Sequence, residues 1–310
     1  YYGMGKGQIE SLNGRKLHNL GFMGQGMTIA VLDAGFMNVD KIAAFRNLNI
    51  KGTHNFVAGY DNDVYKEMDH GTKTLSTIAM NQPTVFVGTA PKADFWLLRT
   101  EDYSTESPAE EDFWIAAVEF SDSVGVDIIS SSLGYHGFDD ISMNYRYSDL
   151  NGRTTAISQA ASRLASKGMI LVNSAGNDGM GTWKKINVPA DAHDILTVGA
   201  VSLDKVNAPF SSIGPTADGR IKPDVMAYGC PTNVVSGRGY IIPDNGTSFA
   251  CPLIAGMVAC LWQACPNKSA KEIIYIIRQS GNNCQSPDNI MGYGIPDFWS
   301  AYQSATRYNQ

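Results

Sequence analysis

The feature that most constrains the fold is the alternation of short apolar runs with helical patterns from residue 27 to about residue 265. The apolar runs are rich in Val, Ile and Leu and lack polar–apolar alternation, which is typical of strands covered on both faces. Strands alternating with helices favour one parallel, doubly wound sheet. The predicted strands are residues 27–32, 94–99, 127–131, 170–174, 196–200 and 224–227. The predicted helices are residues 72–80, 108–124, 155–167 and 248–264.

No repeat, low-complexity tract or linker divides the 310 residues, so the sequence predicts a single domain over residues 1–310. The chain starts at Tyr1 without a charged and apolar leader, and we expect any signal peptide to be absent from it. The net charge is −6 and no Lys/Arg cluster occurs, which argues against nucleic acid as a partner. No apolar run approaches the ~18 residues of a membrane span, so none is predicted.

Five cysteines lie in the last third of the chain, and no two of them have the CxxC spacing of a zinc site. The odd number leaves at least one thiol free. The simpler interpretation is that most are small buried apolar residues. The alternative is a single bridge, such as Cys265–Cys284, in an exported protein.

Polar or glycine-rich residues follow three of the predicted strands. Asp33 comes directly after one strand, residues 130–134 end another, and residues 174–177 end a third. In open α/β sheets, ligands bind outside the carboxyl ends of the strands. These three segments are therefore expected to face one cleft.

Two further segments place reactive side chains at predicted helix starts. Ser248 follows Gly246 and Thr247 at the start of a long apolar pattern, where backbone N–H groups are free to bind an anion. His70 precedes Gly71 at the start of another helical pattern. Each signal is weak alone, because Ser248 could equally be a helix cap and His70 a surface residue.

Together, Asp33, His70 and Ser248 have the residue types of a serine-nucleophile triad. A serine nucleophile needs a neutral imidazole to take its proton. That imidazole needs a carboxylate, which fixes its tautomer and stabilises the developing cation. The combination therefore predicts acyl-transfer chemistry.

Four segments resemble the signature blocks of the subtilases, the subtilisin-like serine proteases: residues 30–35, 70–72, 173–177 and 246–252. Subtilisin also carries its triad in the order Asp, His, Ser. The resemblance covers roughly residues 20–300, and it points to subtilases of Bacteroidetes bacteria. Shorter segments agree with the family at residues 88–93, 131–134, 210–215 and 222–224.

The resemblance implies a three-layer subtilisin-like α/β fold, with a mostly parallel doubly wound sheet and helices on both faces. It implies a serine endopeptidase that works through an acyl-enzyme, with Asp33, His70 and Ser248 as catalytic residues. The Asn177 amide and the backbone N–H of Ser248 would form the oxyanion hole. From composition alone, Asn177 would be a turn residue. The resemblance also implies synthesis with an N-terminal propeptide, which is expected to be absent from this chain.

The resemblance assigns residues 131–134 to pairing with the substrate backbone. It assigns the same residues, together with Ala175 and Gly176, to the walls of the pocket for the residue before the scissile bond. Because these residues are small, we expect the pocket to admit large side chains. Trp183 is expected either to floor or cap this pocket or to be a core residue. The assigned residues are Ser131, Ser132, Leu133, Gly134, Ala175 and Gly176.

Two positions depart from the family pattern. Lys73 follows the His70 block where a second His or a Val-Ala-Gly run is frequent, and it is expected to alter helix packing. Ala34 stands where Ser or Thr usually follows the aspartate, which removes a hydroxyl that could steady Asp33.

Acidic residues gather just past the predicted strand 94–99. The simpler interpretation is a solvated acidic loop and helix start. The alternative is that some of them bind a basic side chain or a peptide amino terminus, as in an exopeptidase or a specialised processing protease. These residues are Glu101, Asp102, Glu106, Glu110 and Glu111.

The predicted chemistry requires no cofactor. The resemblance allows structural calcium, with Asp61 and Asp63 among the candidate acids, but no ordered calcium-loop pattern occurs and the metal ligands stay unknown. We expect protein or peptide substrates, a monomer, and a secreted, periplasmic or cell-surface location. A non-catalytic binding protein is the remaining alternative, which an intact triad disfavours. The other histidines are interpreted as structural: His18, His54, His136 and His193.

Overall fold

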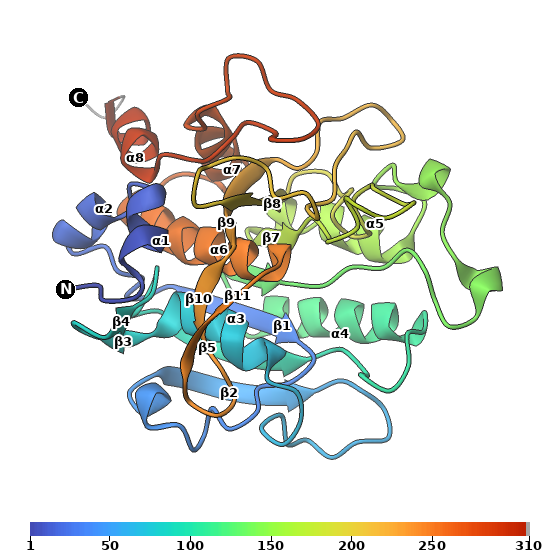
Figure 1. Ribbon diagram of the computed structural model, residues 1–310, viewed down its shortest axis with the longest axis horizontal. Coiled ribbons are helices and arrows are strands. Elements are labelled where there is room, and N and C mark those ends of the chain that lie inside the picture. The colour runs from blue at the N-terminus through green and yellow to red at the C-terminus, as the bar shows by residue number, and fades with distance from the viewer. Residues whose placement is uncertain (308–310) are drawn as a thin grey trace.

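A seven-stranded sheet organises the protein in the computed structural model, which describes residues 1–307; residues 308–310 of the predicted domain lie outside it. Its strand order is β2-β5-β1-β6-β7-β8-β9, and every neighbouring pair is parallel (Figure 1). The predicted doubly wound sheet is therefore confirmed. The strands are β1 (Thr28–Asp33), β2 (Asn49–Asn55), β5 (Asp94–Arg99), β6 (Ile128–Ser131), β7 (Ile170–Ser174), β8 (Leu196–Ser202) and β9 (Val225–Cys230).

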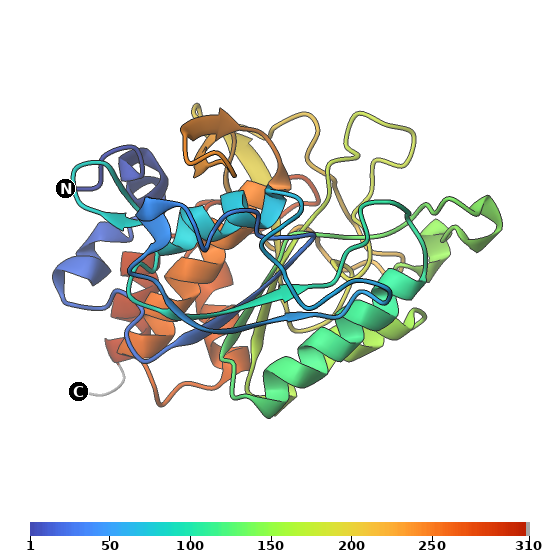
Figure 2. The ribbon, with the colours of Figure 1, turned by 90° about the horizontal axis from the view of Figure 1, so that it is seen from below.

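Helices cover both faces of the sheet. Figure 2 shows α3 (His70–Ala79) and α6 (Thr247–Ala264) on one side of the sheet and α4 (Ala109–Ser123) on the other, where α5 (Ala156–Ser162) also packs. The remaining helices are α1 (Lys6–Ser11), α2 (Arg15–Asn19), α7 (Ala270–Gln279) and α8 (Phe298–Thr306). Two small hairpins are formed by β3 (Asn81–Gln82) with β4 (Phe86–Val87) and by β10 (Thr232–Val235) with β11 (Ile241–Asp244).

Two apolar cores flank the sheet, which explains why the strand sequences do not alternate. In β1, Ile29 and Val31 point into the core beneath α3 and α6, whereas Ala30 and Leu32 point into the core beneath α4 and α5. Successive side chains of a strand point to opposite faces, so a strand covered on both faces needs apolar residues throughout.

Strand β2 is an edge strand that the sequence pattern does not predict. Its residues are exposed or half-buried, and its sequence NIKGTHN contains no apolar run. By contrast, β5 and β7 have the predicted bounds, because both are enclosed by neighbours and read as continuous apolar segments.

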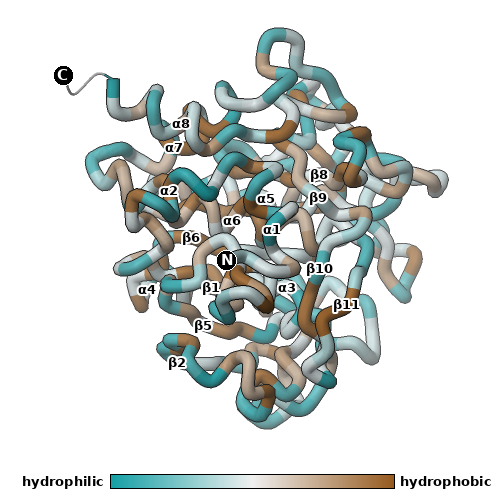
Figure 3. The backbone as a smooth tube through the Cα atoms, turned by 60° about the vertical axis from the view of Figure 1, so that its left-hand side comes forward, coloured by the Kyte–Doolittle hydropathy of each residue, from teal (hydrophilic) through white to brown (hydrophobic). Residues whose placement is uncertain are grey.

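Helix α6 is the central helix of its core. By length and composition alone this helix could cross a membrane, which the sequence does not predict. Most of it is buried inside the protein, as expected for a core helix. Helices α2, α7 and α8 pack beside it (Figure 3). Its buried position brings its first turn to the carboxyl-end side of the sheet, next to α3.

Candidate active site

Asp33 and His70 meet where β1 ends and α3 begins. Asp33 is the last residue of β1 and is only 2% exposed, and its Oδ1 lies 2.7 Å from His70 Nδ1. Because the carboxylate accepts, Nδ1 donates, and Nε2 is left as the basic nitrogen of the neutral ring. Burial lowers the pKa of His70, but the Asp33 charge and hydrogen bond outweigh it and raise that pKa above its ordinary value.

Asp33 is held by further donors that the sequence did not reveal. The backbone N–H of Ala34 donates to Oδ1 at 2.7 Å, and the Thr74 hydroxyl donates to Oδ2 at 3.1 Å. Thr74 lies one turn after His70 on α3, so one helix supplies both contacts. The expected loss of a steadying hydroxyl at Ala34 is therefore compensated by Thr74.

Ser248 lies at the start of α6, which packs against α3, the helix that begins with His70. Gly246 precedes the helix with a φ of 151°, a left-handed conformation that favours glycine. Ser248 is 9% exposed, and the ring of the next residue, Phe249, lies 5.6 Å from the His70 ring. As the second residue of α6, Ser248 belongs to the first turn, whose N–H groups have no partner within the helix.

A hydrogen bond ties the serine to the segment that follows β6. The carbonyl of Ser248 would normally accept from the N–H four residues later, but that residue is Pro252, which has none. Instead, the hydroxyl of Ser132 donates to the Ser248 carbonyl at 2.8 Å. Sequence reasoning missed this role of Ser132, although Pro252 four residues after Ser248 is a signal that could have suggested it.

Asn177 is exposed and lies in the loop after β7, with its amide oriented by α6. Its Oδ1 accepts from the backbone N–H of Thr247 at 2.9 Å and from the Thr247 hydroxyl at 3.0 Å. The same hydroxyl accepts from the N–H of Gly176 at 3.2 Å. Because Oδ1 is engaged, the NH₂ group of Asn177 is directed away from Thr247 and remains available as a donor.

Comparison with known proteins identifies the family. The family profile Peptidase_S8, described as the subtilase family, matches residues 24–294. The chain belongs to the subtilase family. Similar proteins include Subtilisin NAT of Bacillus subtilis subsp. natto, which is 30% identical over 257 residues, covering 82% of this chain and 60% of that protein. The thermostable alkaline protease of Halalkalibacterium halodurans is 28% identical over 292 residues, or 93% of this chain and 70% of that protein.

Solved structures share the fold of this subtilase. MycP1 from Mycobacterium smegmatis has a TM-score of 0.73 at 22% identity, covering 96% of this chain and 84% of that chain. MycP1 with its N-terminal propeptide removed has a TM-score of 0.73 at 21% identity, covering 96% of both chains. The subtilase chain spans about 60% of the length of the first curated relatives, Subtilisin NAT and Subtilisin E.

The predicted substrate segment of the subtilase lies partly inside the sheet. Ser131 is fully buried between β1 and β7, and its hydroxyl accepts from Trp114 Nε1 at 3.0 Å. Its assignment as a substrate contact is wrong, because the sheet encloses it on both sides. Leu133 and Gly134 lie beyond the strand and are half-buried. Among the described residues, their backbone N–H groups have no hydrogen-bond partner.

Asn187, which the sequence does not predict as a site residue, lies between the two predicted walls of the pocket. Asn187 donates its backbone N–H to Ala175, and the next residue, Val188, forms an antiparallel bridge with Tyr135, directly after Gly134. Ala175 itself is fully buried, so only its backbone belongs to this region. The Asn187 segment therefore connects the wall after β6 with the wall after β7.

Within the acidic stretch after β5, Glu106 is exposed, as expected for a solvated loop, but Glu110 and Glu111 fit neither interpretation from the sequence. Glu110 and Glu111 are only 1% and 6% exposed. The Glu110 carboxylate accepts from the N–H groups of Asp102 and Ser107, both at 3.1 Å. The Glu111 carboxylate accepts from the Tyr145 hydroxyl at 2.6 Å. These carboxylates are engaged within the protein, so they are neither solvated nor directed at a ligand.

Glu101 completes this internal group of carboxyls. It accepts from the hydroxyl of Tyr135, the residue that follows Gly134. This hydrogen bond connects the segment after β6 with the segment after β5. Burial and the neighbouring Glu110 carboxyl raise the pKa of Glu101 well above its ordinary value. Burial also raises the pKa of Glu111 to about 7.

All five cysteines are free in the described residues, so the alternative bridge Cys265–Cys284 is not formed. Three of them are buried, in agreement with the simpler interpretation. Cys251 illustrates this role: it follows Ser248 by one helical turn, its thiol faces the Val172 carbonyl at 3.2 Å, and burial raises its pKa to about 12.

The candidate calcium acids do not fit a calcium site. Asp61 and Asp63 both face Lys66, whose ammonium nitrogen lies 2.7 Å and 3.6 Å from their carboxylates. That ammonium group already supplies the positive charge these acids attract. Over residues 1–307, no three His, Cys, Asp or Glu side chains form a group that could hold a metal ion.

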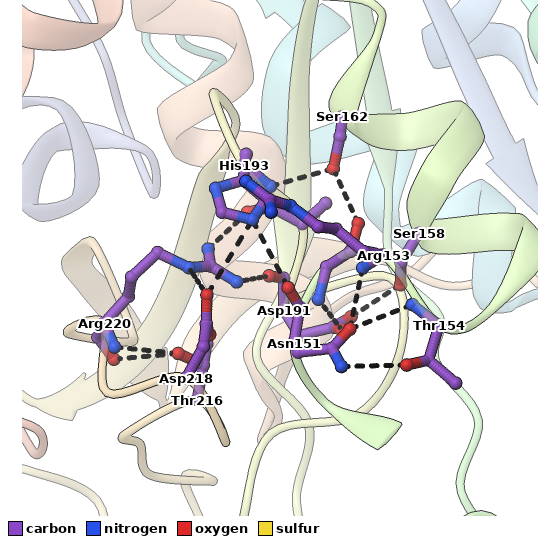
Figure 4. A network of polar contacts seen from close by, with 12 residues as sticks. Asn151, Arg153, Thr154, Ser158, Ser162, Asp191, His193, Thr216, Asp218 and Arg220 are labelled. Atoms are coloured by element: carbon purple, nitrogen blue, oxygen red, sulfur yellow. Dashed lines mark hydrogen bonds and ion pairs between the residues drawn. The ribbon is translucent and has the colours of Figure 1, made fainter. Parts of the chain in front are cut away.

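Three of the remaining histidines make structural contacts. His18 Nε2 donates to the Thr89 carbonyl at 2.8 Å and its Nδ1 accepts from the Tyr2 hydroxyl at 3.0 Å. His54 packs on Phe56 with ring centroids 4.4 Å apart. His193 belongs to the polar network of Figure 4, where its Nε2 lies 3.3 Å from the carbonyl of Asn151.

In the same network, the Arg220 guanidinium donates to the backbone carbonyls of Asp191 and Ala192, and the Asp191 carboxylate accepts from Gly152. His193 thus helps to fasten the loops that precede α5 and β8. The fourth histidine, His136, stacks on Trp183 near the predicted pocket, with ring centroids 4.5 Å apart.

Proposed function

We propose that the chain is a serine endopeptidase that cuts peptide bonds through an acyl-enzyme intermediate. The observation that carries this proposal is the 2.7 Å contact between His70 Nδ1 and the buried carboxylate of Asp33, beside the helix start that bears Ser248. Such a contact leaves the other ring nitrogen as a base. Membership of the subtilase family supports the same reaction.

In the proposed reaction, Ser248 Oγ attacks the carbonyl carbon of the scissile bond while His70 Nε2 takes its proton. The negative oxygen of the tetrahedral intermediate accepts from the Asn177 NH₂ group and from the Ser248 N–H. His70 then protonates the leaving amine, and the acyl-enzyme forms. Water, deprotonated by His70, attacks the acyl group and releases Ser248.

Asp33 stays ionised throughout these steps. It orients the imidazole and stabilises the imidazolium that forms when His70 takes the proton. Thr74 and the Ala34 N–H, which also donate to this carboxylate, hold it in place. Thr247 has the corresponding role for Asn177, because its donors fix the amide oxygen and so aim the NH₂ group.

The substrate backbone is proposed to pair with the segment after β6. The free N–H groups of Leu133 and Gly134 can bind main-chain carbonyls of an extended peptide. Main-chain pairing of this kind accepts many sequences. It therefore favours cleavage within chains over recognition of a terminus.

The exopeptidase and processing-enzyme alternative rested on the acidic stretch. Glu110 and Glu111 are buried and hydrogen-bonded within the protein, so they give this alternative no support. The alternative of a non-catalytic binding protein does not explain the orientation of His70 and Asn177.

Finer properties are also part of the proposal. We propose one catalytic unit over residues 1–310, a monomer that acts on proteins or peptides, secretion from a Bacteroidetes-type bacterium, and a reaction without a cofactor. The secreted location is supported by similarity to subtilisins. Structural calcium has no assigned ligands, since Asp61 and Asp63 both contact Lys66.

A serine-directed fluorophosphonate probe tests the reaction. We expect it to label the native chain and the matched control Ser11→Ala, and to leave Ser248→Ala unlabelled. Absence of labelling in the native chain would overturn the proposal. Digestion of a mixture of unfolded proteins then separates the alternatives, because an endopeptidase produces internal cuts and an exopeptidase removes only terminal residues.

A further inference from the structure

The side chain of Asn187 occupies the space between the two pocket walls. A Cβ atom placed on Gly134 would lie 2.8 Å from Asn187 Cβ, and one placed on Gly176 would lie 2.7 Å from Asn187 Nδ2. Both distances are shorter than ordinary carbon or nitrogen contacts. The two wall glycines therefore both lie against the Asn187 side chain.

Asn187 is held in this place at both ends of its amide. His136 Nδ1 donates to its Oδ1 at 2.9 Å, and its Nδ2 donates to Asp178 Oδ2 at 2.9 Å. The residue is only 8% exposed. A side chain that is buried and bound at both its polar atoms cannot turn aside without leaving those atoms unpaired, which is costly.

The partners of Asn187 are themselves supported. The His136 ring stacks on Trp183, with ring centroids 4.5 Å apart and planes 8° apart. Trp183 in turn donates to the Ile186 carbonyl at 3.1 Å, directly before Asn187. Trp183 therefore supports Asn187 through His136 and through the residue that precedes Asn187.

From this geometry we propose that Asn187 determines specificity by closing the pocket for the residue before the scissile bond, so that the enzyme accepts alanine- or serine-sized residues there and rejects large ones. This inference rests on the proposed endopeptidase function. It differs from the sequence-based expectation of an open pocket, because small walls leave room only when no third side chain lies between them.

The test compares peptide anilides that differ only in the residue before the cut, with Ala, Ser, Leu or Phe at that position. In the native chain, kcat/KM for Ala should exceed that for Phe by at least about tenfold, since a few carbons in a pocket change discrimination by factors of this order or more. Asn187→Gly should raise kcat/KM for Phe by about tenfold or more and change that for Ala little.

Asn187→Ala is the second variant, because it shortens the side chain without adding backbone freedom. Asn13→Gly is the matched control: it removes the same side chain far from the pocket, at a residue whose φ is 52°, which glycine adopts readily. Thermal unfolding of all variants verifies that they fold. The control should keep the native preference.

Two results would overturn the inference. One is a native preference for Phe or Leu over Ala, and the other is a Phe-to-Ala ratio that neither Asn187 variant changes. Fluorophosphonate labelling separates this failure from a failure of the proposed function. If Ser248 is labelled and the preference is absent, only the inference falls; if Ser248 is not labelled, the endopeptidase proposal falls and the inference falls with it.

Discussion

The bond from the Ser132 hydroxyl to the Ser248 carbonyl gives a prediction that can be worked out from the structure. Both residues are largely buried, at 7% and 9% exposure, and the donor–acceptor distance is 2.8 Å. Ser132→Ala removes the donor and leaves a buried carbonyl without a partner. Such a loss costs about 1–3 kcal/mol of the free energy of unfolding.

Replacing Pro252 tests whether the lost stability comes from the unpaired Ser248 carbonyl. Pro252→Ala restores an N–H four residues after Ser248, which can donate to the same carbonyl within α6. In the Pro252→Ala background, Ser132→Ala should therefore cost less than in the native background. We expect a coupling of about 1 kcal/mol between the two substitutions.

The assay is urea unfolding followed by circular dichroism, with all variants carrying Ser248→Ala. That change removes self-digestion and keeps the backbone carbonyl under study. The midpoints are compared where the slopes agree, since equal slopes mean that the same surface is exposed on unfolding. Ser130→Ala is the matched control, because its hydroxyl is buried two residues away and has no hydrogen-bond partner in the described chain.

Two outcomes would refute the reasoning. If Ser132→Ala costs the same in both backgrounds, the Ser248 carbonyl is not the group that needs the hydroxyl. If Ser130→Ala costs as much as Ser132→Ala, the loss reflects packing and not the hydrogen bond. The expected pattern is a small effect at Ser130, a larger one at Ser132, and a reduced one at Ser132 when Pro252 is replaced.

Three further predictions concern catalysis and pH. Asn177→Ala should lower kcat by about 10²–10³, the range found for the corresponding asparagine of subtilisin. Thr247→Val should cause a smaller loss. Equal kcat in the native chain and both variants would contradict the oxyanion role. Because the reaction needs neutral His70 and the Asp33 contact raises its pKa, activity should fall on the acid side around a pH above 6.5. Asp33→Asn should move that fall to lower pH and reduce kcat by about 10⁴, and a pH–rate profile that does not move would argue against the contact. Burial raises the pKa of Glu111 to about 7, so the stability it contributes is present at low pH and is lost as pH rises through about 7. Glu111→Gln should therefore flatten the pH dependence of the free energy of unfolding between pH 5 and 8. At pH 8 it should stabilise the protein by roughly 1–3 kcal/mol, as measured by urea midpoints. A steeper pH dependence would contradict this.

The sequence by itself determined six of the seven strands of the sheet and the reactive groups. Strands β5 and β7 have the predicted bounds, because strands covered on both faces need continuous apolar runs, and such runs are visible locally. Asp33 and His70 could be proposed because each lies directly at the end of a predicted strand or the start of a predicted helix. The chemistry of a serine nucleophile linked them to Ser248, and the family resemblance added Asn177.

Tertiary structure alone decided how these groups are supported. The contact between Asp33 and His70 joins residues 37 positions apart, and the bond from Ser132 to Ser248 joins residues 116 positions apart. Periodicity and local motifs report whether a residue is buried, but they do not report which distant side chain it meets. The same limit explains the edge strand β2, whose polar residues gave no apolar run.

The pocket shows this division most clearly. Gly134 and Gly176 are small residues, and from them we expected an open pocket. Only the folded chain brings Asn187 between them and fixes its amide with His136 and Asp178. The size of a pocket depends on every side chain that reaches it, and those side chains come from separate loops that only the packing of the sheet and helices brings together.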